Sequence, residues 1–361
     1  EGTLTGGSIV RTKIQGGWVV GFQNGGHAIL KDGVVVVEDD RILHVGPGFE
    51  GHVDRTLDAS GKLVSPGFVN IHAVANIDIQ TLGLDTNKAG FASSRAFAVD
   101  GLGEVEFTGE RLRTSALYSL VQLLKGGSTT IVEITTMAPS RFEVPRDEVP
   151  ALVDAAAELG ARIYVSHKFR AGKRFLDDDG VWKYHWDYDA AREAMAHAVE
   201  IVARYEGAHD DRVRTMLFPY QFDACAELLA EVKRASKKLD VPVHMHTSQS
   251  LFEFHDCLRR YNKTPVQFLN DIGFLDPRTI LTHLIYTTLH PASGYPQGDT
   301  SDLRVVADSG AHVAHCSMVY VRRGKILGSF SRYREMGINV PLGTDTFPQD
   351  MIEEMRWAAL A

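Results

Sequence analysis

The sequence has few cysteines and no long apolar runs, and both absences narrow the class of protein. Its three cysteines, Cys225, Cys257 and Cys316, lie far apart, and none belongs to a Cys-x-x-Cys pair. We therefore expect no disulfide framework, and the predicted location is the reducing cytoplasm. No apolar stretch approaches the length of a membrane span, and the first residues lack the apolar core of a signal peptide. No membrane association is expected.

Clusters of positive charge are also absent. The 361 residues carry a formal net charge of −8, and acidic and basic residues are interspersed. Because nucleic-acid binding requires a basic surface, this pattern excludes nucleic acid as the expected partner and favours a small molecule or a peptide. The predicted partners are a small-molecule substrate and further copies of the same chain, as a homo-oligomer.

The pattern of apolar residues divides the chain after residue 64. Residues 1–64 read as all-β, with apolar stretches separated by Gly and Asp-Gly turns, and predict part of a small β-sandwich domain. From residue 65 onward, short β-rich runs alternate with longer amphipathic stretches. The predicted strands are 66–72, 128–134, 161–167, 213–220, 242–248, 279–286, 311–318 and 338–345.

Eight strands with complete crossovers between them predict a TIM (β/α)₈ barrel, whose active site lies at the carboxyl ends of the strands. No G-x-G-x-x-G follows the first of these strands, which disfavours a dinucleotide-binding sheet. The sequence ends at Ala361, inside the helix expected after the eighth strand. We therefore expect the barrel domain, 65–361, to be incomplete at its C-terminus and the native chain to continue.

Histidines recur at one structural position. Of 15 histidines, six fall in or at the end of the strand runs: His72, His244, His246, His283, His312 and His315. A single histidine there is more often a packed core residue than a metal ligand. Their recurrence at strand ends indicates a common site.

Four of the strand ends carry the residue types of a hydrolytic metal site. Such a site needs neutral imidazoles and a carboxylate around one ion, with a position open for water. His72, His246, His283 and Asp345 end strands one, five, six and eight. His244 shares a strand face with His246 but lies deeper, so His246 is the better ligand. Asp345 is also a candidate general base, although an isolated Asp at this position is more often a helix cap.

Five segments then resemble the motifs of the amidohydrolase superfamily, in order and spacing: KLVSPGFVNIH, VHMHTSQ, LTHL, GAHVAHCS and GINVPLGTD. The similar branch contains triazine hydrolases and cytosine or guanine deaminases. The resemblance implies a barrel beside a β-sandwich that C-terminal strands complete. It implies that His72, His246 and Asp345 bind one divalent metal ion, with Zn²⁺ expected first and Co²⁺, Fe²⁺ or Mn²⁺ as alternatives. It also implies that His283 binds the metal or polarises substrate or water.

The first strand departs from the family pattern. The family has His-x-His, whereas this sequence has His72-Ala73-Val74, and valine cannot bind a metal. The nearest substitute is Asn70, and an Asn-x-His motif resembles that of phenylurea and thiocarbamate (molinate) hydrolases. An Asn also precedes the ordinary motif, so a structural role for Asn70 is an equal alternative.

A second departure bears on the reaction. Deaminases of the family have Glu three residues after the strand-five histidine, where this sequence has Gln249. An amide hydrogen-bonds but cannot donate and recover a proton at neutral pH. The sequence therefore favours hydrolysis of a C–N or C–S bond in a neutral amide, urea or (thio)carbamate. The alternatives are a ring deaminase or dehalogenase, and a binding protein that has lost catalysis.

In the favoured mechanism, metal-activated water attacks an sp² carbon, Asp345 takes the proton and His283 stabilises the oxyanion. Further substrate contacts are predicted from Gln249, His167, Lys168 and Trp182. Trp182 lies in the aromatic insertion 175–188 and either lines an apolar pocket or packs that loop down. His315-Cys316 on strand seven resembles the family's His-Cys-Pro turn but lacks the proline, and we expect it to be structural.

Overall fold

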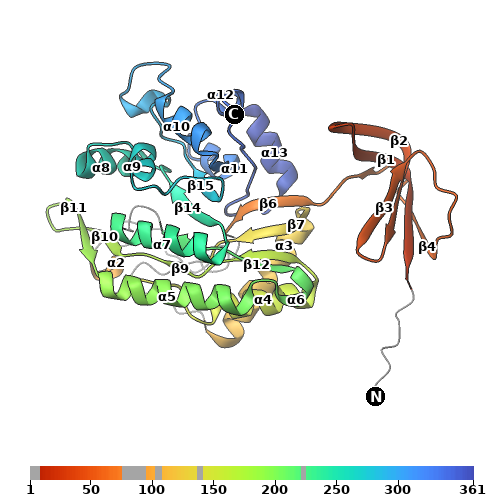
Figure 1. The fold of residues 1–361 in the computed structure, drawn as a ribbon, viewed down its shortest axis with the longest axis horizontal. Coiled ribbons are helices and arrows are strands. Elements are labelled where there is room, and N and C mark those ends of the chain that lie inside the picture. The colour runs from red at the N-terminus through yellow and green to blue at the C-terminus, as the bar shows by residue number, and fades with distance from the viewer. Residues whose placement is uncertain (1–8, 75–94, 102–107, 136–140, 221–224) are drawn as a thin grey trace. The chain divides into compact units, whose positions relative to one another are not determined.

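The computed structural model describes residues 9–74, 95–101, 108–135, 141–220 and 225–361. The chain divides into two compact units, Glu1–Gly67 and Phe68–Ala361 (Figure 1). In the described parts of the chain, no helix is both long and apolar enough to cross a membrane.

The first unit is a five-stranded sheet of order β3-β2-β1-β4, with β5 also paired to β1. Its strands are β1 (Arg11–Gln23), β2 (Gly26–Glu38), β3 (Arg41–Gly46), β4 (Arg55–Asp58) and β5 (Leu63–Val64). The β1–β2 turn is Asn24-Gly25, both with positive φ, which is the conformation that favours Asn-Gly in a tight hairpin. The sandwich that a C-terminal segment completes stays a prediction.

The second unit is built on parallel strands that alternate with helices. Parallel pairing links β6-β7-β8-β12, β9-β13 and β14-β15-β16. These strands are β6 (Phe68–Ala73), β7 (Ser128–Glu133), β8 (Arg162–Val165), β9 (Lys168–Phe169), β12 (Val213–Thr215), β13 (Phe218–Pro219), β14 (Val243–Thr247), β15 (Thr279–His283) and β16 (His312–Ala314).

Single parallel bridges connect these groups of strands. Leu217 pairs with Val243, which joins the fourth predicted strand to β14. Residues 338–345 then lie between β16 and β6, because His315 pairs with Leu342 and Ala73 pairs with Asp345. The unit therefore has a TIM-barrel-type α/β fold, as the sequence predicts.

Several predicted strands are shorter in the structure. The third and fourth each divide into two short strands, β8 with β9 and β12 with β13. The seventh ends at Ala314, because a helix begins at Ser317. Residues 338–345 contact their neighbours through single bridges and form no continuous strand.

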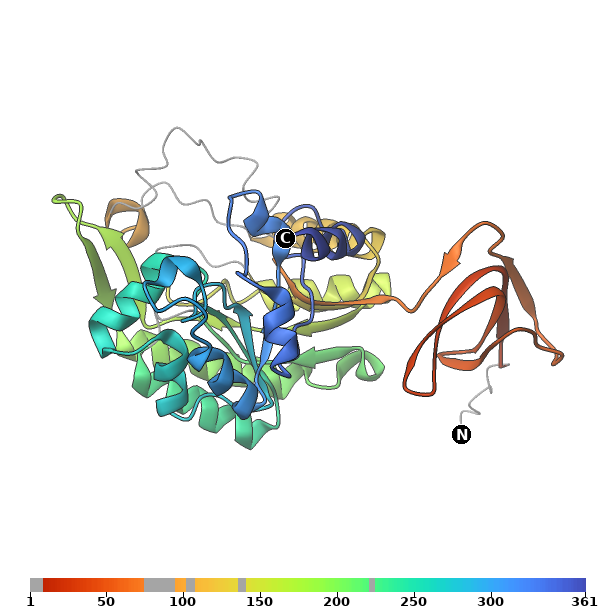
Figure 2. The same ribbon diagram turned by 90° about the horizontal axis from the view of Figure 1, so that it is seen from above.

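The helices lie around the strands of the second unit (Figures 1 and 2). They are α2 (Arg95–Ala98), α3 (Gly109–Lys125), α4 (Glu148–Leu159), α5 (Tyr188–Tyr205), α6 (Ala208–Asp211), α7 (Ala226–Leu239), α8 (Leu251–Tyr261), α9 (Pro265–Asp271), the 3₁₀ helix η4 (Pro291–Ser293), α10 (Ser301–Ser309), α11 (Ser317–Val321), α12 (Phe330–Glu335) and α13 (Met351–Leu360). The aromatic insertion forms an antiparallel hairpin, β10 (Gly172–Leu176) with β11 (Trp182–Trp186).

Strand alternation in β14 explains how the site forms. Val243 and Met245 belong to the apolar core that also contains Leu229 of α7. Successive side chains of a strand point to opposite faces, so His244 and His246 face away from that core. The same apolar burial that attaches α7 to the strand therefore presents two histidines on the opposite face of β14.

Candidate metal centre

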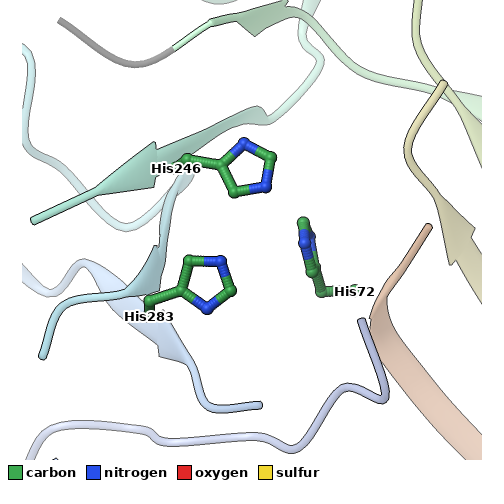
Figure 3. A group of neighbouring side chains, drawn as sticks. All are labelled: His72, His246 and His283. Atoms are coloured by element: carbon green, nitrogen blue, oxygen red, sulfur yellow. The ribbon is translucent and has the colours of Figure 1, made fainter. Parts of the chain in front are cut away.

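Three histidines from three strands converge inside the second unit. His72 lies on β6, His246 on β14 and His283 at the end of β15. A ring nitrogen of each lies within 4.8 Å of the other two, and the rings point toward a shared space (Figure 3). All three are buried. The structure thus brings together three of the predicted ligands.

Asp345 and Cys316 adjoin this group. One donor atom of each, together with one of His72, forms a second set within 4.8 Å. His283 Nε2 lies 3.6 Å from Asp345 Oδ2, which connects the two sets. The predicted carboxylate therefore lies beside the imidazoles.

The main chain is closely packed where Asp345 meets His72. Asp345 N donates to His72 O at 2.9 Å. A Cβ on Gly343 would lie 2.7 Å from both the backbone N and O of His72, so only glycine permits this approach. His283 and Asp345 also have φ angles of 76° and 56°, in the left-handed region that non-glycine residues rarely adopt. Such strain is typical of functional sites.

The three imidazoles leave buried ring nitrogens without hydrogen-bond partners, and such nitrogens are suited to bind a cation. His72 Nε2, His246 Nδ1 and both ring nitrogens of His283 are buried without a hydrogen-bond partner. Burial, and then neighbouring positive charge, lower the pKa of all three histidines well below the usual value, so their rings are neutral. Buried unpaired nitrogens are costly, whereas neutral imidazoles are the common ligands of divalent metals. The residues therefore fit a divalent metal ion.

His244 supports this group from the deeper layer. Its Nε2 lies 3.2 Å from His72 Nδ1 and also contacts Thr282 Oγ1. Burial lowers the pKa of His244 to about 3, so this ring is neutral. When one ring nitrogen of a histidine binds a metal, a hydrogen bond at the other ring nitrogen fixes the ring orientation and the tautomer. His72 Nδ1 is used in this way, and its Nε2 remains for a metal.

Asn70 lies one layer below His72 on β6, and both ends of its amide are engaged. Its Oδ1 accepts from Thr344 N at 3.1 Å and from His72 N at 3.4 Å. Its Nδ2 donates to Thr344 Oγ1 at 2.8 Å and to Ser128 Oγ at 3.4 Å. These bonds connect strand one to the segment that carries Asp345. They match the structural alternative for Asn70, and the ligand role stays a prediction.

Gln249 lies near His283 through Tyr320. The Tyr320 hydroxyl donates to Gln249 Oε1 at 3.0 Å, and the Tyr320 ring centroid lies 4.7 Å from that of His283. Glu253 accepts from Ser248 N at 2.7 Å and from Gln249 N at 3.0 Å, which fixes the loop after β14. Gln249 is thus linked to the cluster through Tyr320, which bonds its amide oxygen and packs against His283.

Lys168 is buried on β9 beside the same site. Its Nζ lies 5.0 Å from the centroid of Tyr220 and 5.8 Å from that of Phe218, whose ring in turn contacts His246. Burial lowers the pKa of Lys168 to about 8, although nearby carboxylates, Glu148 first, oppose this effect. Lys168 therefore titrates closer to neutral pH than an ordinary lysine does.

His167 and Trp182 make their contacts elsewhere. His167 Nε2 lies 2.9 Å from Glu143 Oε2, which also bonds His197 Nδ1 at 2.8 Å. Burial raises the pKa of Glu143, but hydrogen bonds from the two histidines outweigh it and hold the pKa at about 2. Trp182 packs against Phe252 with a ring separation of 5.2 Å. The substrate roles predicted for His167 and Trp182 stay predictions.

Cys316, which the sequence predicts to be structural, lies close to two of the predicted ligands. Its Sγ is within 4.8 Å of a donor atom of His72 and of one of Asp345. Glu354 of α13 bonds Ser317 N and Oγ, the latter at 2.5 Å, directly after it. The family's His-Cys-Pro turn was the only signal in the sequence, and it gave no indication of contact with the metal ligands.

A TIM-barrel-type unit with buried histidines and an aspartate at its strand ends is typical of metal-dependent hydrolases. The sequence model of the amidohydrolase family matches residues 63–361, and the chain belongs to this family. The predicted family resemblance is confirmed, and the chain is an amidohydrolase with a divalent metal site.

The curated relatives are named as deaminases. A protein of Archaeoglobus fulgidus named 5-methylthioadenosine/S-adenosylhomocysteine deaminase 2 is 29% identical over 86% of this chain and 65% of its own length. A 5'-deoxyadenosine deaminase of Methanosarcina mazei is 25% identical over 92% of this chain and 69% of its own length. The chain thus spans about two thirds of these relatives. The closer similarity to phenylurea and molinate hydrolases is not supported.

Solved structures show the same fold. Atrazine chlorohydrolase from Arthrobacter aurescens, in complex with zinc, has a TM-score of 0.73 at 23% identity and covers 92% of this chain and 72% of its own. An adenosine deaminase from Xanthomonas campestris with bound zinc has a TM-score of 0.73 at 19% identity and covers 97% of this chain and 73% of its own. At these identities the likeness concerns the fold.

Proposed function

We propose that the chain is a metal-dependent aminohydrolase that releases ammonia from an amino-substituted heterocycle of the adenosine type. The observation that carries this proposal is the cluster of His72, His246 and His283, whose ring nitrogens lie within 4.8 Å of one another, with Asp345 Oδ2 3.6 Å from His283 Nε2. The names of the relatives favour deamination, which the sequence analysis had placed second to urea or carbamate cleavage. Zn²⁺ is the first metal to test, because it is bound in two structural neighbours.

A divalent ion held by these residues would supply Lewis acidity and would lower the pKa of water. Asp345 is the residue proposed to take a proton from that water, because a carboxylate beside it serves as general base. His283 is buried with its Nε2 3.6 Å from Asp345 Oδ2, and we assign it to the developing negative charge on the attacked centre. Gln249, held by Tyr320, donates a hydrogen bond to the substrate from its amide nitrogen.

Deamination also requires a proton for the leaving nitrogen, and Gln249 cannot supply it. We assign this step to Lys168, which is buried beside the aromatic rings that contact His246. In the protonated form its ammonium donates to the departing amine, and a pKa of about 8 keeps that form populated at neutral pH. The buried histidines are neutral there and cannot take this role.

Hydrolysis of an open-chain urea, amide or (thio)carbamate is the second candidate. The specific observation in its favour is Gln249, because an amide occupies the position where the deaminases of the family have a carboxylate. With N-substituted ureas and amides or with thiocarbamates, this reaction releases a substituted amine or a thiol in place of ammonia, so with such substrates the products distinguish the two candidates.

The test is a product assay on the purified protein loaded with Zn²⁺. Adenosine, 5'-deoxyadenosine and 5'-methylthioadenosine are offered in parallel with phenylureas and thiocarbamates, and ammonia, aniline and thiol are measured. Ammonia release that Asp345→Asn abolishes supports the proposal. Release of aniline or thiol alone would replace it with the second candidate, and no product from either set would contradict both.

A further inference from the structure

Cys316 is placed among the predicted metal ligands. It follows β16 and is 1% exposed. Its Sγ lies within 4.8 Å of a donor atom of His72 and of Asp345. Those two residues are themselves predicted ligands, so the thiol shares their immediate surroundings.

The histidine that the two sets share has one ring nitrogen without a hydrogen-bond partner. His72 is fully buried, its Nδ1 lies 3.2 Å from His244, and its Nε2 has no hydrogen-bond partner. His72 belongs both to the set with His246 and His283 and to the set with Cys316 and Asp345. The two sets therefore share His72.

The backbone around Cys316 is fixed from two sides. His315 N donates to Pro341 O at 2.9 Å, and Gly343 N donates to His315 O at 2.9 Å, which joins Cys316 to the segment carrying Asp345. On the other side, the Glu354 carboxylate accepts from Ser317 Oγ at 2.5 Å and from Met318 N at 3.2 Å. The backbone on both sides of Cys316 is thus fixed before any metal binds, which limits the positions of its thiol.

Strand one has lost a donor at the same centre. The family's second strand-one histidine is replaced by Val74, which has no ligand atom. We propose that Cys316 Sγ is a ligand of the divalent metal ion, together with His72 and Asp345. Coordination forms a metal–sulfur bond, and the thiol proton passes to solvent. A thiolate is a soft ligand, so the site should prefer Zn²⁺, Co²⁺ or Fe²⁺ to Mg²⁺ or Mn²⁺.

This inference depends on the metal site of the proposed function, and it does not depend on the substrate. X-ray absorption spectroscopy of the zinc-loaded protein tests it without a variant. A sulfur scatterer at ~2.3 Å, beside nitrogen and oxygen at ~2.0–2.1 Å, is expected. If only nitrogen and oxygen atoms bind the zinc, Cys316 is not a ligand, while the metal site itself is unaffected. Failure to bind zinc would overturn both.

Cobalt substitution provides a second measurement with a matched control. Co²⁺ bound to a thiolate has a near-ultraviolet charge-transfer band, which Cys316→Ser should abolish. Cys257→Ser is the control, because Cys257 is also buried but lies on α8. Removing a direct ligand should weaken Co²⁺ binding by at least ~10-fold, since losing an outer partner already costs 10–100-fold. Bound cobalt without this band in the wild-type protein contradicts the inference, as does a band that survives in Cys316→Ser.

The same data separate the two proposals. If the zinc spectrum shows a sulfur ligand but the protein deaminates none of the substrates tested, the inference about Cys316 holds and the proposed function is wrong. Circular dichroism of Cys316→Ser reports whether the variant folds. If the variant does not fold, X-ray absorption spectroscopy of the zinc-loaded wild-type protein alone decides whether Cys316 is a ligand.

Discussion

The side-chain amide of Asn70 is hydrogen-bonded in both directions to Thr344, the residue before Asp345. Thr344 N donates to Asn70 Oδ1 at 3.1 Å, and Asn70 Nδ2 donates to Thr344 Oγ1 at 2.8 Å. Strand one therefore holds the segment that presents the candidate base. Asn70, the candidate replacement ligand, thus has a structural role: it connects β6 to the segment that carries Asp345.

Asn70→Ala should lower the free energy of unfolding by about 1–3 kcal/mol, the range for buried groups left without partners. Metal occupancy should be unchanged, because the amide is engaged by Thr344 and His72 N. Thermal unfolding and metal analysis of the same samples check both points. A loss of metal that excess Zn²⁺ restores would show instead that Asn70 is a ligand.

The sequence predicted the parts of this centre that lie at strand ends. An apolar run that ends in histidine, as at His72, His246 and His283, is a local pattern with a direct structural meaning. The sequence also predicted Asp345, because it follows such a run. The predicted seventh strand, 311–318, is too long, because α11 begins at Ser317. Glu354 of the distant α13 accepts a hydrogen bond from Ser317, the first residue of α11.

Contacts between distant segments were not predictable. Cys316 approaches His72 only because residues 338–345 lie between β16 and β6. Glu143, His167 and His197 come from a loop, a strand end and a helix, and no spacing in the sequence connects them. Gly343 permits the approach to His72, but a single glycine after an apolar run has no unique meaning.

Metal content gives the most direct test of the centre. The purified protein should hold about one divalent ion per chain, and a chelator should abolish activity, because the two candidate ligand sets share His72. Elemental analysis and an activity assay with added chelator check this. Full activity in excess chelator would remove the metal from the reaction, and two ions per chain would contradict a mononuclear centre.

Asp345→Asn should lower turnover by at least ~10²-fold, the lower range of general-base effects. The change keeps the size of the side chain but removes the proton acceptor and a negative ligand. The rate constant kcat, measured at saturating metal, separates loss of the base from loss of binding. A near wild-type kcat would assign Asp345 to a structural turn.

Because of Lys168, turnover should fall as the pH rises into the alkaline range. The folded-state pKa of about 8 means that the donor form is present below that pH and is lost as pH rises through it. The rate should therefore fall above pH ~8. In Lys168→Met the rate should fall ~10²–10⁴-fold with no alkaline limb of this origin. An unchanged pH profile in the variant would remove Lys168 from proton transfer.

The same variant should be more stable at neutral pH. Lysine in the unfolded chain keeps its usual pKa of 10.5, so between about 8 and 10.5 the unfolded state binds more protons and stability rises with pH. Below about 8 the buried charge costs on the order of 3 kcal/mol, which Lys168→Met removes. Lys233→Met is the control: Lys233 is buried but bonded to Asp276 at 2.6 Å, so its loss should destabilise the fold without affecting the pH profile.

Val74→His would rebuild the family's histidine pair on strand one, because positions 72 and 74 share a strand face. Val74 packs against Val132, Ile134 and Phe218, so the larger ring must displace apolar neighbours. We expect tighter metal binding without faster turnover, because a further ligand occupies the position needed by water or substrate. In the Cys316→Ser background, the same change should restore Co²⁺ affinity, since one new donor replaces the lost thiolate. Competition with a chelator of known affinity measures both effects. If Val74→His alters affinity in neither background, and His72→Ala also retains its metal, strand one does not contact the ion.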